Sequence, residues 1–206
     1  MNKIIDKLRE RLGKELPGRE AQLKMAPSVM HEADDSNAVK SSVLILIYPK
    51  NNSLYIVLIK RPEYNGHHSG QISFPGGKCE PSDKCYEDTA LRETFEEIGI
   101  IREDIQVLGQ ITSIYIPPSN FKIYPIVGYL SYTPTFNINS TEVERTIEIK
   151  MADLTDKSII KIKEVKTSTG QYINAPYYSI EDEVIWGATA MILAEFITII
   201  AIDTTI

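Results

Sequence analysis

The sequence predicts an α/β fold in which helices cover both sides of a β-sheet. Three observations lead to this prediction. Two runs rich in β-branched and aliphatic residues, 41–49 and 53–61, are separated by a short polar stretch, which is typical of a β-hairpin. Two later segments, about 85–98 and 183–202, favour helices. With 43% hydrophobic and 24% charged residues, the 206-residue chain also suits one domain with a sizeable core.

The first forty residues are expected to form an extension, residues 1–40, ahead of a main domain at residues 41–206. The extension starts with apolar residues at helical spacing, namely Ile4, Ile5, Leu8 and Leu12. This packing helix should end at Pro17-Gly18. Residues 19–40 are polar and irregular, so we interpret them as a linker that crosses the surface.

The helix predicted from about Cys85 to Ile98 has a start signal and a stop signal. A side-chain oxygen of Ser82 or Asp83 can accept a hydrogen bond from an unpaired N–H group of the first turn. Gly99 stands where a left-handed residue commonly ends a helix.

The two faces of this helix differ in chemistry. Helical periodicity places four residues on a packing stripe, Leu91, Thr94, Phe95 and Ile98. The same periodicity gathers three carboxylates on the other side, those of Glu93, Glu96 and Glu97. Such neighbours repel one another and weaken a bare helix, whereas a divalent cation such as Mg²⁺ would reverse the effect. Arg92 could hold one carboxylate in place. The alternative is a solvated acidic helix face.

The stretch around this helix resembles the Nudix box, G-x5-E-x7-R-E-U-x-E-E-x-G-U, in which U is aliphatic. Its second half matches at Arg92, Glu93, Glu96, Glu97, Gly99 and Ile100, with Thr94 at the first U position. In the first half, Asp83 stands where the box has Glu, and one extra residue precedes Arg92. Since the extra residue lies in the loop, we expect the helix and the metal site to survive it.

This resemblance implies a Nudix-type α/β/α sandwich with a central mixed β-sheet. It also implies that Mg²⁺ or Mn²⁺ is bound by Glu93, Glu96, Glu97 and the backbone carbonyl of Gly77. Arg92 would then orient the carboxylates.

The segment before the box resembles a signature of coenzyme A pyrophosphatases, a Nudix subgroup. The matching positions are Leu58, Lys60, Arg61, His68, Gly70, Gln71, Ser73, Phe74, Pro75, Gly76 and Gly77. The resemblance implies substrate contacts at Lys60, Arg61 and Gly70. Gly66 replaces an Arg that is usual in the subgroup, and Lys78 or Lys122 could compensate for it. For His67 and His68, a role in loop structure competes with proton transfer.

Two further segments carry candidate residues. The loop Ile116–Phe121 contains two prolines and resembles a run common in the same subgroup, so Ser119 and Phe121 are candidate substrate contacts; the alternative is that Phe121 enters the core. Further on, Glu142 could complete the metal shell or deprotonate the attacking water. Glu144 is the second choice, because residues two apart on a strand share a face. The alternative is a solvent-facing acidic strand end.

The β-pattern continues beyond the box. Strands are expected within residues 102–115, 122–132 and 145–150, and a further hairpin around residues 167–170. The apolar run 183–202 resembles the C-terminal helix of the coenzyme A subgroup. Because Glu195 interrupts it, we interpret it as a buried helix and not as a membrane span.

The combined prediction is a metal-dependent pyrophosphohydrolase that cleaves coenzyme A or acyl-coenzyme A to 3′,5′-ADP and (acyl-)phosphopantetheine. The alternatives are a Nudix hydrolase of another nucleoside diphosphate derivative, such as ADP-ribose or a dinucleoside polyphosphate, and a non-catalytic nucleotide-sensing module. With a net charge of −6, no long basic stripe and two cysteines, the expected setting is the cytoplasm, without nucleic-acid or membrane partners. A homodimer is left open.

Overall fold

The computed structural model describes residues 2–27, 34–62, 70–166 and 172–201. Within these ranges, eight strands form the main sheet: β1 (Val39–Lys50), β2 (Ser53–Lys60), β3 (Ile72–Ser73), β4 (Gly76–Lys78), β5 (Gln106–Gln110), β6 (Ile114–Ile116), β7 (Phe121–Tyr129) and β8 (Arg145–Lys150). A second sheet contains β9 (Ile160–Lys166), β10 (Tyr172–Ile180) and β11 (Glu183–Trp186). The α-helices are α1 (Asn2–Leu12), α2 (Gly18–Leu23), α3 (Tyr86–Ile98) and α4 (Gly187–Ala201).

The main sheet is mixed, as predicted, and β1 is its central strand. β1 runs parallel to β7 and antiparallel to β2 and β4. Asn51 and Asn52 join β1 to β2 with φ angles of 49° and 58°, the left-handed conformations that a tight two-residue hairpin turn requires. Residues 44–48 of β1 are completely buried, which shows that both faces of the strand are covered.

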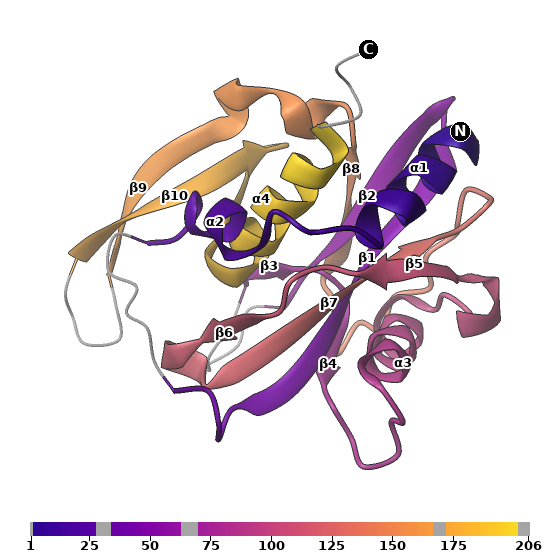
Figure 1. Cartoon of the computed structure of the whole chain (residues 1–206), viewed down its shortest axis with the longest axis horizontal. Helices are drawn as coiled ribbons and strands as arrows, with labels where there is room; N and C mark the ends of the chain where they lie inside the picture. The colour runs from indigo at the N-terminus through magenta and orange to yellow at the C-terminus, as the bar shows by residue number, and fades with distance from the viewer. Residues whose placement is uncertain (1, 28–33, 63–69, 167–171, 202–206) are drawn as a thin grey trace.

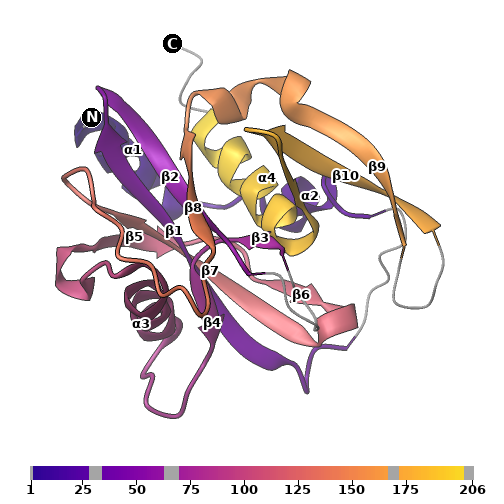
Figure 2. The same ribbon diagram turned by 180° about the vertical axis from the view of Figure 1, so that it is seen from behind.

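Different elements cover the two faces of the main sheet. Leu44 and Leu46 of β1 pack in the cluster that contains Ala90, Leu91 and Ile98 of α3. Ile45 and Ile47 point to the opposite face, in the cluster that includes residues of α1, α4, β10 and β11. Figures 1 and 2 show the same arrangement, with α3 on one side of β1 and β7 and with α4 and the second sheet on the other. The mixed α/β fold is therefore as predicted.

The linker predicted for residues 19–40 is wrong at its start, because residues 18–23 form α2. Tertiary contacts explain this short helix. Glu195 of α4 accepts hydrogen bonds from the Gly18 N–H (3.1 Å) and the Gln22 side-chain amide (2.8 Å). The same carboxylate accepts bonds from the Thr112 hydroxyl (2.7 Å) and N–H (3.3 Å). We refer to Gly18, Gln22, Thr112 and Glu195 as the Glu195 clasp.

The helix at the N-terminus and the C-terminal helix both pack on the core. Ile5, Leu8 and Leu12 of α1 are buried, while Ile4 is exposed. The run predicted as one C-terminal helix begins instead with strand β11, and α4 starts at Gly187. No helix among the described residues is long and apolar enough to cross a membrane.

Candidate functional site

Helix α3 is fixed at both ends. At its start, the ring of Tyr86 stacks on Tyr124 of β7 with 3.5 Å between the ring centroids. At its end, Gly99 is left-handed (φ 73°) and its N–H donates to the Phe95 carbonyl, as predicted. Cys85 occupies the N-cap position without a side-chain cap, so the prediction that Ser82 or Asp83 caps the helix is wrong.

The packing stripe of α3 also differs from the prediction at one residue. Leu91, Thr94 and Ile98 are buried, but Phe95 is 54% exposed. Glu97 is 1% exposed, because it lies on the side of the helix that faces β4. One of the three predicted carboxylates is therefore enclosed by protein.

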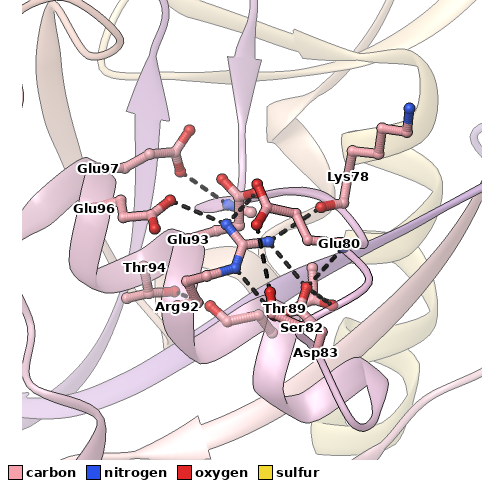
Figure 3. Close-up of polar contacts among 12 residues, drawn as sticks. Lys78, Glu80, Ser82, Asp83, Thr89, Arg92, Glu93, Thr94, Glu96 and Glu97 are labelled. Atoms are coloured by element: carbon pink, nitrogen blue, oxygen red, sulfur yellow. Dashed lines mark hydrogen bonds and ion pairs between the residues drawn. The ribbon is translucent and has the colours of Figure 1, made fainter.

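Arg92 connects the acidic residues around α3. Its Nη1 lies 3.0 Å from Glu93 Oε1 and 3.0 Å from Glu96 Oε2, and its Nη2 donates to the Lys78 carbonyl at 3.1 Å. Figure 3 shows the guanidinium group at the centre of these contacts. The predicted orienting residue thus touches two of the predicted metal ligands.

Asp83 holds the other edge of the Arg92 guanidinium. Its two oxygens accept from Nε and Nη2, each at 3.0 Å, which is the bidentate geometry that fixes a guanidinium in one plane. The Thr89 hydroxyl and the Glu80 N–H also donate to Asp83. These bonds, above all the one from Arg92, hold the Asp83 pKa well below its usual range. Sequence analysis missed this role, although the position of Asp83 in the box was the available signal.

Glu97 carries the most perturbed carboxylate of the site. Its Oε2 accepts from the Gly76 N–H at 2.8 Å, and its Oε1 lies 3.4 Å from Arg61 Nη2. Burial raises the pKa of Glu97 to about 8, and the nearby charges of Glu93 and Glu142 add to the effect. The Gly76 and Arg61 contacts oppose it. Burial also raises the pKa of Glu93.

The glycine turn lets the backbone approach these carboxylates. A Cβ atom at Gly77 would overlap with the carboxylate of Glu93. One at Gly76 would overlap with the Ser42 carbonyl, since Gly76 and Gly77 pair with Val43 and Ser42 of β1. The packing therefore excludes a side chain at Gly76, and a side chain at Gly77 would displace the Glu93 carboxylate.

Glu142 lies in the turn before β8 and not on the strand. The turn is attached to the end of α3, because the Asn139 N–H donates to the backbone carbonyl of Glu97 at 2.9 Å. The Asn139 side chain donates to Glu142 Oε1 at 3.3 Å. The charge of Glu142 contributes to the raised pKa values of Glu93 and Glu97, so it lies near both. Glu144 points to a different partner, Lys60, with 3.6 Å between Nζ and Oε1.

The predicted substrate contacts before the box lie at the end of β2 and the start of β3. Arg61 reaches Glu97, and its backbone N–H donates to the Gln71 carbonyl at 3.0 Å. Lys60 lies between Glu144 and Glu183. Gly70 is left-handed (φ 64°), and its N–H donates to the Pro62 carbonyl. His67, His68 and Gly66 lie outside the described residues.

Ser119 and Phe121 lie further from the carboxylates. Phe121 pairs with Val39 of β1, three residues before the Ser42–Tyr124 pair and thus about 10 Å along the strands. Phe121 is half-buried and does not belong to the core clusters. The Ser119 hydroxyl donates to the Ile116 carbonyl.

Lys78 and Lys122, the two candidates to replace the Arg that is missing at Gly66, have different surroundings. Lys122 is engaged in an ion pair with Asp35, at 2.7 Å. Lys78 is exposed at the end of β4, and its carbonyl accepts from Arg92.

The arrangement fits a hard divalent cation whose coordination shell is completed by ligands from outside the protein. In the described part of the chain, no three acidic, His or Cys side chains converge into a ready-made metal centre. Arg92 engages Glu93 and Glu96 instead, and the Gly76 N–H engages Glu97. Mg²⁺ commonly takes only one or two carboxylates and fills its shell with waters and phosphate oxygens. The buried Glu97 and the half-buried Glu93 repel each other, and they can supply those one or two carboxylates.

The sequence is similar to a known family and to proteins within it. The NUDIX domain family matches residues 39–161. Nudix hydrolase 3 from Caenorhabditis elegans is 30% identical over 192 residues, which cover 86% of this chain and 79% of that protein. The uncharacterized Nudix hydrolase NudL from Photorhabdus laumondii is 30% identical over 172 residues, covering 84% and 89%. The MutT protein structure from Methanosarcina mazei Go1 is 16% identical, with a TM-score of 0.48 and coverage of 78% of this chain and 92% of that one.

Proposed function

The chain belongs to the NUDIX domain family of hydrolases, and from this premise we propose that it is a metal-dependent pyrophosphohydrolase of coenzyme A or acyl-coenzyme A. The products would be 3′,5′-ADP and (acyl-)phosphopantetheine. One observation carries the hydrolytic part of the proposal. Glu97 is a buried carboxylate with a pKa of about 8, and it lies beside Glu93, Gly76 and Arg61.

The proposed cation is Mg²⁺ or Mn²⁺, held by Glu93, Glu96, Glu97 and the Gly77 carbonyl. Such an ion neutralises phosphate charge and lowers the pKa of the attacking water. The absence of a side chain at Gly77 supports the proposal, because it lets the Gly77 backbone lie directly against the Glu93 carboxylate.

The protein's own residues then have distinct roles. Arg92, held in one plane by Asp83, orients Glu93 and Glu96. Glu93 or Glu142 accepts the proton of the attacking water. The two carboxylates are close enough for the charge of Glu142 to affect the pKa of Glu93. A positioned base of this kind typically contributes about 10²–10⁴-fold to the rate.

The substrate assignment rests on the residues before the box. Arg61 and Lys60 would contact phosphate oxygens, and Gly70 would contact the substrate as well. Ser119 and Phe121, about 10 Å along the sheet, would contact the distal part of the substrate. Coenzyme A is long enough to reach from the diphosphate to such a distant contact. The domain assignment, with an extension at residues 1–40 and a Nudix domain at 41–206, is part of the same proposal.

A second candidate is hydrolysis of another nucleoside diphosphate derivative, such as ADP-ribose or a dinucleoside polyphosphate. The observation that favours it is Gly66, which stands where the coenzyme A subgroup has Arg. The ion pair between Lys122 and Asp35 supports this candidate further, since it removes one of the two lysines that could compensate.

The test is a hydrolysis panel with coenzyme A, acetyl-coenzyme A, ADP-ribose and diadenosine polyphosphates, with Mg²⁺ or Mn²⁺, beside Glu97→Gln. We expect 3′,5′-ADP to be released preferentially from the coenzyme A substrates. In Glu97→Gln, kcat should fall on the order of 10²–10⁴-fold, since the variant removes a charged metal ligand or base while keeping the shape of the side chain. Exposed Glu87→Gln in the first turn of the same helix is the matched control.

The other outcomes discriminate between the candidates. Preference for ADP-ribose or the dinucleotides would reject the coenzyme A assignment and keep the metal chemistry. A protein that binds these nucleotides but hydrolyses none of them would be a sensing module.

A further inference from the structure

Two cations lie directly opposite each other where β2 and β8 pair. Lys60, the last residue of β2, pairs with Arg145, the first residue of β8. Side chains that face each other across an antiparallel pair are neighbours, and like charges in this position are destabilising. Lys60 and Arg145 therefore need negative charge between them.

Two carboxylates provide that charge in the free protein. Glu183, at the start of β11, forms an ion pair with Arg145 and lies 3.8 Å from Lys60 Nζ. Glu144 lies 3.6 Å from the same Nζ. Both distances to Lys60 exceed the 2.7–3.2 Å of a usual N–H···O bond, so these carboxylates balance the charge of Lys60 without tight bonding.

The cation pair lies close to the proposed catalytic site but on the other face of the sheet. Lys60 is on the same face of β2 as Ile56 and Leu58, which face α4 and the second sheet. Arg61 is on the opposite face, with Val57 and Ile59, which face α3. Its side chain reaches Glu97. A ligand that crosses this edge of the sheet can contact Arg61 with one part and Lys60 and Arg145 with another.

We propose that Lys60 and Arg145 form a binding subsite for a phosphate monoester, and that Glu183 is the counter-ion which this phosphate displaces. A dianionic phosphate matches the two cations better than a single carboxylate, and Arg145 can donate to two of its oxygens. Exposure fits the proposal, because 44% of the Arg145 side chain and 22% of the Lys60 side chain are open to solvent.

The subsite refines the proposed function, on which its biological use rests. Coenzyme A carries one phosphate monoester, on the 3′ position of its ribose, in addition to the diphosphate that is cleaved. ADP-ribose carries no such group. Arg145 of β8 would then supply a guanidinium of the kind that the subgroup signature has at the position of Gly66.

The experiment compares two probes that differ only in the 3′-phosphate, 3′,5′-ADP and 5′-AMP, by titration calorimetry on the full chain. Arg145→Gln should lower the affinity for 3′,5′-ADP about tenfold, which corresponds to the loss of about one charge-assisted hydrogen bond. The affinity for 5′-AMP should stay the same. Glu183→Gln should raise the affinity for 3′,5′-ADP severalfold, because it removes the carboxylate that competes with the phosphate. Lys50→Gln is the matched control, since it removes a cation that pairs with Glu148 of β8 and lies away from Lys60 and Arg145.

The sign of the Glu183→Gln effect separates the proposal from a structural role. If Glu183 only clamps the second sheet to the main sheet, Glu183→Gln lowers the melting temperature and leaves the affinity unchanged or weaker, which would overturn the proposal. Equal losses for both probes in Arg145→Gln would also overturn it. The hydrolysis panel is independent: a chain that prefers ADP-ribose but shows the predicted calorimetry keeps the subsite and loses the substrate assignment.

Discussion

Glu97 in α3 and Glu195 in α4 are both buried, with 1% and 0% of their surface exposed. The oxygens of Glu195 accept four hydrogen bonds, all from the neutral donors of the Glu195 clasp. Glu97 accepts one short bond, from Gly76, and faces a guanidinium at 3.4 Å. Burial of a carboxylate is thus compatible with two opposite roles. A buried carboxylate with many hydrogen-bond donors joins elements of the fold together. A buried carboxylate with few donors keeps basic, reactive oxygens.

The largest effect on stability is expected when the well-satisfied carboxylate is removed. Glu195→Ala leaves the buried Gln22 amide and the donors of Gly18 and Thr112 without their acceptor, and should lower the free energy of unfolding by about 3 kcal/mol. Urea unfolding followed by circular dichroism measures this. Turnover per folded molecule should stay the same.

Glu195→Gln is the matched variant, because its amide keeps one acceptor oxygen and should lose less. If Glu195→Ala unfolds at the same urea concentration as the wild type, the clasp contributes nothing and the contrast with Glu97 fails.

Removal of the Glu97 charge is expected to stabilise the protein, whereas removal of Glu195 destabilises it. Glu97 has a folded-state pKa of about 8, above its ordinary 4.5, so the fold favours its protonated form. The contribution of this carboxyl to stability is therefore lost as pH rises from 4.5 to 8. Glu97→Gln does not ionise, so the metal-free variant should be more stable than the wild type above pH 8.

Thermal unfolding in EDTA at pH 5, 7 and 9 tests this. The advantage of Glu97→Gln should be small at pH 5, should grow up to about pH 8 and should then level off. A constant difference at all three pH values would mean that the Glu97 carboxyl titrates normally.

The smallest of the three effects concerns Asp83, a well-satisfied carboxylate that holds Arg92 beside the candidate site. Asp83→Asn loses the bidentate pair with Arg92, which should lower the free energy of unfolding by about 1.5 kcal/mol. Because Arg92 also contacts Glu93 and Glu96, kcat should fall about 10–100-fold, as for other residues that support metal ligands.

Ser82→Ala serves as the control, since it changes the neighbouring exposed residue of the same loop. A loss of stability with unchanged kcat would show that Asp83 supports the loop alone.

The parts of the fold that depend on local pattern could be predicted from sequence. The hairpin of β1 and β2, the end of α3 at Gly99 and the buried C-terminal helix each follow from periodicity or turn chemistry. The short helix α2 could not be predicted in this way, because the donors of Gly18 and Gln22 are satisfied by a residue from the other end of the chain.

The same limit applies to the candidate site. The positions of the glutamates on α3 followed from helical spacing, but the burial of Glu97 depends on β4, which packs against the helix. Asp83 was interpreted as a helix cap because its bond to Arg92 spans nine residues and has no local signature. Arg145 and Lys60 meet only through strand pairing.

The Glu195 clasp also has a consequence for protein synthesis. Gly18 and Glu195 are 177 residues apart, so at about 5–20 residues per second a ribosome makes the acceptor roughly 10 to 35 s after the donor. During this interval α2 has no carboxylate to bind and lacks α4, the helix against which it packs. Helix α2 therefore docks only after α4 has been synthesised, and a chaperone that binds nascent apolar segments can bind α2 until then.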